Sequence, residues 1–153
     1  SHRGGREAAL QAPDPFDLER FVRAQDPVHD RAMAELRAGR KTSHWMWFVF
    51  PQLRALGRSP MAVRYGIGSA AEARAYLAHP RLGPRLALAT RTVMAVKGAT
   101  LEAIFGPVDA IKFRSSMTLF TAVADEDDWP FAAALAQCCG GMPDEQTVAL
   151  LRA

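Results

Sequence analysis

Cysteine is scarce in this 153-residue chain, and its two cysteines, Cys138 and Cys139, are neighbours. A disulfide between adjacent residues is strained, and most disulfides close longer loops. We therefore predict two free thiols, as in a reducing cytoplasm. Together with the four scattered histidines, the pair matches no ligand spacing of a zinc site. Neither a metal nor another cofactor is expected.

Long apolar runs are also missing. No stretch of the chain approaches the roughly 20 apolar residues that a membrane-spanning helix needs. Residues 1–12 are polar and basic, and they contain neither the apolar segment nor the cleavage site of a secretory signal. We therefore expect a cytoplasmic protein without a membrane partner.

Lysine is the third scarce residue type, because only three of the 19 cations are Lys and the formal net charge is +3. The cations are spread along the chain without the basic block or aromatic-interleaved stripe of a nucleic-acid-binding surface. This spread argues against nucleic acid as a partner. Arg takes nearly every other cationic position, so the placement of Lys41 and Lys112 in the two most unusual segments draws attention to them.

Helix caps supply most of the boundary signals. Ser59-Pro60 combines an N-cap with Pro at the first helical position, and Ser69-Ala-Ala-Glu72 has the form of a capping box. No Asn-Gly or Asp-Gly hairpin turn occurs. The sequence therefore predicts the all-α class, as a compact bundle of about seven to eight short helices. They are expected near residues 15–26, 28–38, 69–79, 84–96, 107–123 and 130–137, with others beginning at 60, 100 and 144.

The length of the chain fits one domain with a substantial core. Residues 1–13 contain Gly4-Gly5 and no periodic apolar pattern, so they are predicted to form a disordered N-terminal arm. Residues 14–153 are predicted to form the single helical domain.

The segment Lys41–Gln52, here called the aromatic block, holds two of the three Trp and two of the eight Phe. A helix would place Trp47 and Phe48 beside His44, whereas a strand would alternate them between two faces. In either geometry His44 is expected against aromatic rings, as a neutral acid, base or hydrogen-bond donor. The alternative is a core segment whose His is satisfied by backbone or by Gln52.

The second unusual segment, Lys112–Phe120, interrupts an apolar helix with polar residues. Asp109, Ser115 and Ser116 lie three or four positions from Lys112, so they are predicted to share its side of the helix. A Lys beside hydroxyl groups can hold a phosphate or carboxylate, or activate a Ser nucleophile, although no oxyanion element accompanies these serines. The simpler alternative is an ion pair between Asp109 and Lys112.

Tyr65 lies among a cation and glycines in the segment Arg64–Gly68. This segment lacks the full spacing and the preceding strand of a dinucleotide-binding loop, and an ordinary turn explains it. Tyr65 is retained as a candidate stacking or hydroxyl group.

Four segments together resemble a bacterial family of small proteins with a domain of unknown function, some members of which carry the label calpastatin by transferred annotation. These segments are Asp14–Val22, His44–Gln52, Ile104–Asp109 and Lys112–Phe120. The resemblance extends from about Asp14 to the C-terminus and implies an all-helical single domain, with no established activity and no catalytic residue. Calpastatin-type inhibitors are disordered repeats, and this chain is compact and unrepeated.

These features favour a helical domain that binds a small anionic ligand. The aromatic block would stack a planar, nucleotide-like group, while the lysines and serines would hold the anion. The predicted ligand-binding residues are Lys41, Trp47, Gln52, Tyr65, Asp109, Lys112, Ser115 and Ser116. Whether the protein is an enzyme stays open, and His44 is then the candidate acid or base. The alternative is a non-enzymatic protein-interaction or structural module with a protein partner, in which these residues are core.

Overall fold

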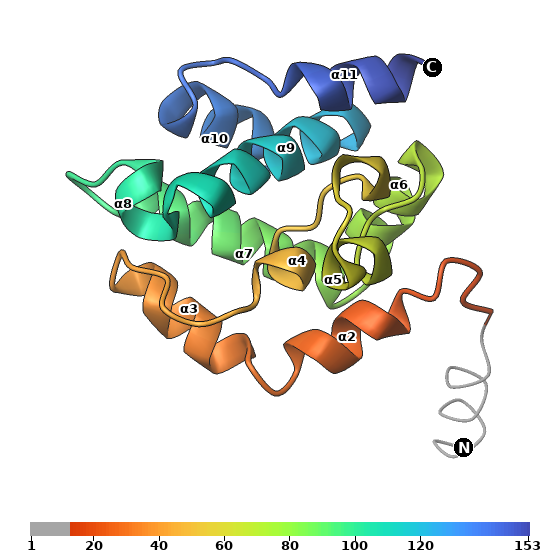
Figure 1. The fold of residues 1–153 in the computed structure, drawn as a ribbon, viewed down its shortest axis with the longest axis horizontal. Helices are drawn as coiled ribbons and strands as arrows, with labels where there is room; N and C mark the ends of the chain where they lie inside the picture. The colour runs from red at the N-terminus through yellow and green to blue at the C-terminus, as the bar shows by residue number, and fades with distance from the viewer. Residues whose placement is uncertain (1–12) are drawn as a thin grey trace.

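The computed structural model describes residues 13–153, and the chain is helical over that range (Figure 1). The helices are α2 (Glu19–Gln25), α3 (His29–Arg37), α4 (Met46–Val49), η1 (Arg54–Leu56), α5 (Pro60–Arg64), α6 (Ala70–Ala78), α7 (Leu82–Ala95), α8 (Leu101–Phe105), α9 (Pro107–Val123), α10 (Phe131–Cys138) and α11 (Glu145–Arg152). β pairing within the described range is limited to one isolated bridge, between Leu53 and Ile67.

The predicted all-α class is confirmed, and residues 13–153 contain ten α-helices in place of the seven to eight expected. The very short helices α5 and α8 begin where the sequence predicts them, whereas the four-residue α4 lies in the aromatic block, for which helix and strand had both stayed open. The predicted arm at residues 1–13 lies outside the described residues except for Pro13, so it stays a prediction. None of the helices between residues 13 and 153 is long and apolar enough to cross a membrane.

Helices α7 and α9 form the centre of the bundle. Helix α9 packs against α6, α8, α10 and α11, while α7 packs against α3, α6 and α10 (Figure 1). Phe113, Met117, Leu119 and Phe120 of α9 are fully buried. The shorter helices α4 and α5 lie between this centre and α2 (Figure 1). The aromatic block contacts the first half of α9, because the ring centroids of Phe50 and Phe113 are 5.2 Å apart.

Side-chain caps begin several helices where the sequence predicts them. Ser59, Ser69 and Thr100 each accept a hydrogen bond from the backbone N–H three residues further on. Asp144 does the same for α11. Two expectations differ from the structure, because α7 begins at Leu82 and α10 begins at Phe131 without a side-chain cap.

A buried ion pair connects α2 with α6 and the segment between α5 and α6. Arg20 and Glu72 have side chains only 8% and 5% exposed, and Arg20 Nη2 donates to Glu72 Oε2 at 2.8 Å. The other four donor positions of the guanidinium reach the backbone carbonyls of Arg64, Phe16, Asp17 and Gly66. Glu72 Oε1 accepts from the Gly68 N–H, so this carboxylate does not complete the predicted capping box. The desolvated charges are compensated because every donor of Arg20 has an acceptor.

The Arg20→Ala substitution should therefore lower the free energy of unfolding by about 3–5 kcal/mol, because it leaves the buried Glu72 carboxylate with only the 4.0 Å contact to Arg54 and the Gly68 N–H. Arg23→Ala on the same helix is the matched control, since Arg23 is 67% exposed in its pair with Asp17. Its effect should stay within about 1 kcal/mol. Denaturant unfolding of both variants measures the difference, and equal effects would contradict the assigned role of Arg20.

Candidate functional site

The aromatic block contributes mainly to the core. Trp45, Met46, Phe48 and Phe50 are between 1% and 6% exposed, whereas Trp47 is half-buried. The block forms neither of the two regular structures considered, because only Met46–Val49 is helical and the flanking residues are irregular. Trp47 is thus the one aromatic ring of the block that reaches the surface.

Glu35 of α3 fixes the start of the aromatic block. Its Oε1 accepts hydrogen bonds from the Thr42 N–H, the Ser43 N–H and Trp45 Nε1, at 2.8–3.0 Å. Its Oε2 accepts from the Ser43 hydroxyl. Burial opposes ionisation of this carboxyl, but the hydrogen bonds from Ser43, Thr42 and Trp45 outweigh it and lower the pKa of Glu35 to about 2.

Two lysines from distant parts of the sequence share one carboxylate. Lys41 Nζ lies 2.9 Å from Asp109 Oδ2, and Lys112 Nζ lies 3.8 Å from Asp109 Oδ1. The Lys41 side chain is 9% exposed, that of Asp109 is 19% and that of Lys112 is 25%. This Lys41–Asp109–Lys112 cluster carries one net positive charge and is only partly open to water. The predicted Asp109–Lys112 ion pair is present, but the shorter contact is the one from Lys41.

Each ammonium group of the cluster also lies near a tryptophan ring. Lys41 Nζ is 5.2 Å from the Trp45 ring centroid, and Lys112 Nζ is 5.4 Å from the Trp47 centroid. Both distances are within the range of a cation–π interaction. The buried Trp45 therefore lies beside Lys41, and the half-buried Trp47 lies beside Lys112, the more exposed of the two lysines.

A small cavity adjoins the cluster. Its lining includes Trp47, Gln52, Tyr65 and Lys112, four of the predicted ligand-binding residues. Its volume of about 10 Å³ has room for about one water molecule and no more. Gly66 also lines it, and a Cβ at this position would lie 2.4 Å from Arg54 Cα, so the close backbone approach requires glycine there.

Six of the nine predicted site residues therefore lie together. Lys41, Asp109 and Lys112 are joined by ion pairs, and Lys112 lines the same cavity as Trp47, Gln52 and Tyr65. Spacing predicts only that Asp109 and Lys112 are neighbours, and the grouping of the six was inferred from composition, because they come from the aromatic block, α9 and the residue that follows α5.

The other three residues lie in different surroundings. The side chain of His44 is exposed, so the expectation that it packs against aromatic rings is wrong. Ser115 and Ser116 are 3% and 0% exposed, and within the described chain no hydrogen bond joins either to Lys112. Ser115 donates to the Ile111 carbonyl, whereas the Ser116 hydroxyl has no partner among the described residues.

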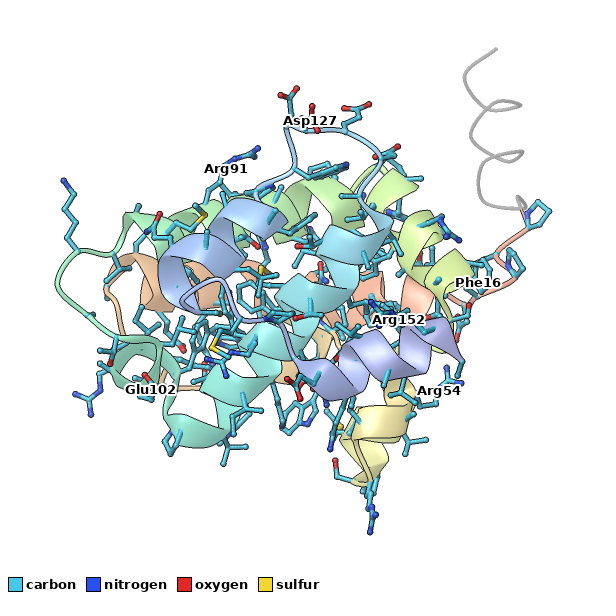
Figure 2. All side chains as sticks on the ribbon, turned by 90° about the horizontal axis from the view of Figure 1, so that it is seen from above. Phe16, Arg54, Arg91, Glu102, Asp127 and Arg152 are labelled. Atoms are coloured by element: carbon cyan, nitrogen blue, oxygen red, sulfur yellow. The ribbon has the colours of Figure 1, made fainter. Side chains whose placement is uncertain are left out.

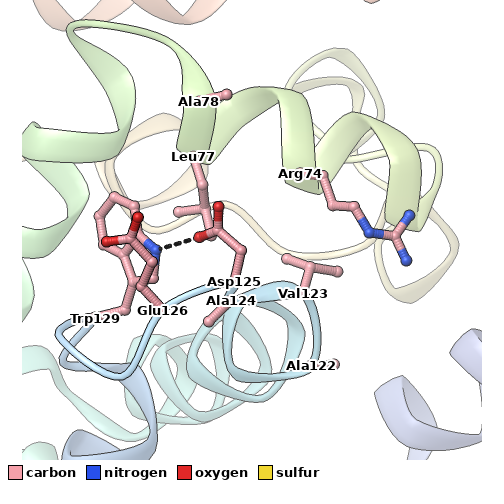
Figure 3. A pocket seen from close by; sticks show the side chains of 9 residues that line it. All are labelled: Arg74, Leu77, Ala78, Ala122, Val123, Ala124, Asp125, Glu126 and Trp129. Carbon is pink, nitrogen blue, oxygen red and sulfur yellow. Dashed lines mark hydrogen bonds between the residues drawn. The ribbon is translucent and has the colours of Figure 1, made fainter.

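A larger hollow lies elsewhere among the described residues (Figure 3). It has a volume of about 510 Å³, and Arg74 of α6 lies on one side of it, with Asp125, Glu126 and Trp129 on the other. Trp129 Nε1 donates to Asp125 Oδ1 at 2.8 Å. Arg91, next to the loop that carries Asp127 (Figure 2), donates to the Asp128 carbonyl at 2.8 Å. None of the nine predicted site residues lines this hollow.

Fold and site together define an all-helical domain with a lysine–carboxylate cluster beside a tryptophan, and comparison with known proteins gives its family. Residues 15–151 match the family described as protein of unknown function, DUF1810, and the chain belongs to it.

The chain is also similar to the crystal structure of the conserved hypothetical protein Rv1873 from Mycobacterium tuberculosis, with 58% sequence identity and a TM-score of 0.89. That match covers 92% of this chain and 99% of the mycobacterial chain. A comparison with curated proteins found no match. The predicted membership of a family of unknown function is confirmed.

The pH dependence of stability should report on Glu35. The folded-state pKa of about 2 lies below the ordinary value of 4.5, so the stabilisation is fully present above pH 4.5 and is lost as the pH falls towards 2. Between pH 5 and pH 2 the wild type should lose about 3 kcal/mol more unfolding free energy than Glu35→Gln. Glu102→Gln, at an exposed position, should behave as wild type. Parallel pH profiles for wild type and Glu35→Gln would refute the assignment.

Ser116→Ala should leave the unfolding free energy unchanged or raise it by about 1 kcal/mol, because it removes a buried hydroxyl without a partner. Thr118→Ala provides the contrast on the same helix. Thr118 Oγ1 donates to the Arg114 carbonyl and accepts from the Asp144 N–H, so its removal should cost about 1–3 kcal/mol. Thermal and denaturant unfolding distinguish the two, and a comparable loss in both would show that Ser116 has a partner.

Proposed function

We propose that the protein binds a small anionic ligand at Lys112, beside Trp47 and the mouth of the small cavity. The supporting observation is the state of the Lys112 ammonium group. It is 3.8 Å from Asp109, beyond hydrogen-bonding distance, and no hydrogen bond from it is present among residues 13–153. An ammonium group has three donors, so Lys112 has donors available for an oxyanion. We also propose a cytoplasmic location, on the basis of the sequence.

Lys41 has a different part in this proposal. Its ammonium is more deeply buried and contacts Asp109 at 2.9 Å, so its charge is already compensated inside the protein. We infer that Lys41 holds Asp109 and the aromatic block in place, while Lys112 faces the ligand. The neighbouring Gln52 amide, on the lining of the same cavity, supplies a further donor.

The size of the cavity limits how a ligand can bind. A volume of about 10 Å³ holds no planar ring, so the anionic group is expected at the cavity mouth and any nucleotide-like ring outside it, against the half-buried Trp47. Ser115 and Ser116 have no part in this arrangement, because they are buried. His44 is exposed and is not assigned a catalytic step.

A protein-interaction function is the second candidate, and one observation favours it. Val108 and Ile111, on the same half of α9 as Lys112, are 65% and 63% exposed. Exposed apolar side chains that lie close together are typical of surfaces that bind another protein. One candidate function predicts a small anion bound at Lys112, and the other predicts a protein bound to the exposed face of α9. The ligand experiment below distinguishes between them.

Lys112→Ala should remove ligand binding without unfolding the protein. In a thermal-shift screen with nucleotides, sugar phosphates, inorganic phosphate and carboxylates, we expect stabilisation of the wild type and none of Lys112→Ala. Its own unfolding free energy should fall by about 1 kcal/mol or less, because the Asp109 contact is long and partly exposed.

Two further variants act as controls in the same screen. Lys97→Ala, at an exposed position, should bind as the wild type does. Lys41→Ala should lose about 1–3 kcal/mol of stability before any ligand is added, because Asp109 loses its close partner. If no compound stabilises the wild type, or if Lys112→Ala binds equally well, this ligand site is wrong and the exposed face of α9 becomes the better candidate.

A further inference from the structure

Asp109 lies close to the region in which an anion at Lys112 would bind, because its Oδ1 is 3.8 Å from the Lys112 ammonium. Its two carboxylate oxygens are divided between the two lysines, Oδ2 at 2.9 Å from Lys41 Nζ and Oδ1 at 3.8 Å from Lys112 Nζ. The second contact is an ion pair without a hydrogen bond, so Oδ1 is within electrostatic range of Lys112 but leaves its donors unused. A ligand oxyanion at Lys112 therefore lies close to a resident negative charge.

We propose that Asp109 is an internal competitor that weakens anion binding at Lys112 and reduces the preference for doubly charged anions. The inference rests on the proposed function, because it concerns the same lysine. It goes further by assigning a charge-selecting role to a residue that need not touch the ligand. The ligand class is a tetrahedral or planar oxyanion whose net charge decides its affinity.

The Coulomb energy between Asp109 and a bound anion is proportional to the charge of that anion, and in a partly buried site it is weakly screened. If removal of the Asp109 charge increases the affinity for a monoanion tenfold, it should increase the affinity for a dianion of the same shape about a hundredfold. A purely structural role of Asp109 predicts no such dependence on ligand charge.

The chain offers a matched control for this charge. Asp26 also bridges two cations, with Oδ2 at 3.3 Å from Arg81 Nη1 and Oδ1 at 2.8 Å from Arg85 Nη2. Asp26→Asn removes the same charge from a bridging carboxylate on a different part of the surface. Any change in anion affinity caused by net protein charge alone appears in both variants, whereas a local effect appears only in Asp109→Asn.

The test is a titration with sulfate and with methyl sulfate, a dianion and a monoanion with similar head groups, at constant ionic strength and pH 7.5. Tryptophan fluorescence reports binding to the full chain, since Lys112 lies over Trp47. We expect Asp109→Asn to bind methyl sulfate about tenfold and sulfate about a hundredfold more tightly than the wild type, and Asp26→Asn to match the wild type. Equal gains for the two anions, or no gain, would overturn the inference.

Further variants distinguish a failure of the proposed site at Lys112 from a failure of the role assigned to Asp109. If wild type binds sulfate and Lys112→Ala does not, the proposed site stands whatever Asp109→Asn does. If Lys112→Ala binds as well as the wild type, the proposed site and this inference both fail. Should Asp109→Asn unfold because Lys41 loses its partner, Lys41→Gln combined with Asp109→Asn removes both buried charges together, which is better tolerated than removal of one. That double variant keeps the cluster charge at +1, and it should still bind sulfate more tightly than Lys41→Gln alone.

Discussion

The buried guanidinium of Arg20 is the contact on which the arrangement of the first half of the chain depends. Its donors reach the turn before α2, the end of α5, the glycine that follows and the carboxylate of α6. A buried charge is tolerated only when its donors find acceptors in good geometry, so these segments are fixed relative to one another. The residues after α5 that meet the aromatic block thereby have a defined position.

The half-buried carboxylate of Glu35 fixes the aromatic block as Arg20 fixes the segments around it. Glu35 orders the turn that leads from α3 to Trp45, and Gln25 then donates to the Phe48 carbonyl at 2.7 Å and to the Tyr76 hydroxyl at 3.0 Å. The exposed part of Trp47 thus belongs to a segment whose backbone is held on both sides. Such pre-organisation is what a binding surface needs, because little conformational freedom is lost when a ligand arrives.

Local signals in the sequence were sufficient for the helix class and for several helix starts, since a cap depends on a side chain and a backbone N–H three residues apart. These signals were not sufficient where a residue's partners are distant in the sequence. They also failed where the prediction assumed a helix that the structure does not contain. His44 was expected beside Phe48, but α4 begins only at Met46, so the helical spacing does not extend back to it. On α9 the long stem of Lys112 carries its ammonium outward, while the short side chain of Ser116 stays in the core. Arg20 and Glu35 gave no signal, because their decisive partners include backbone groups that no pattern identifies.

The separation of Arg20 from its partners has a consequence for the order of folding. Three of its acceptors lie 44, 46 and 52 residues further along the chain. During synthesis, α2 can form as a local helix, but it cannot bury its charge until residue 72 has left the ribosome, because the cost of desolvation would be uncompensated. We therefore expect the N-terminal segment to dock late, and the contacts of α8 with α9 and of α9 with α10, which join segments near one another in the sequence, to form earlier.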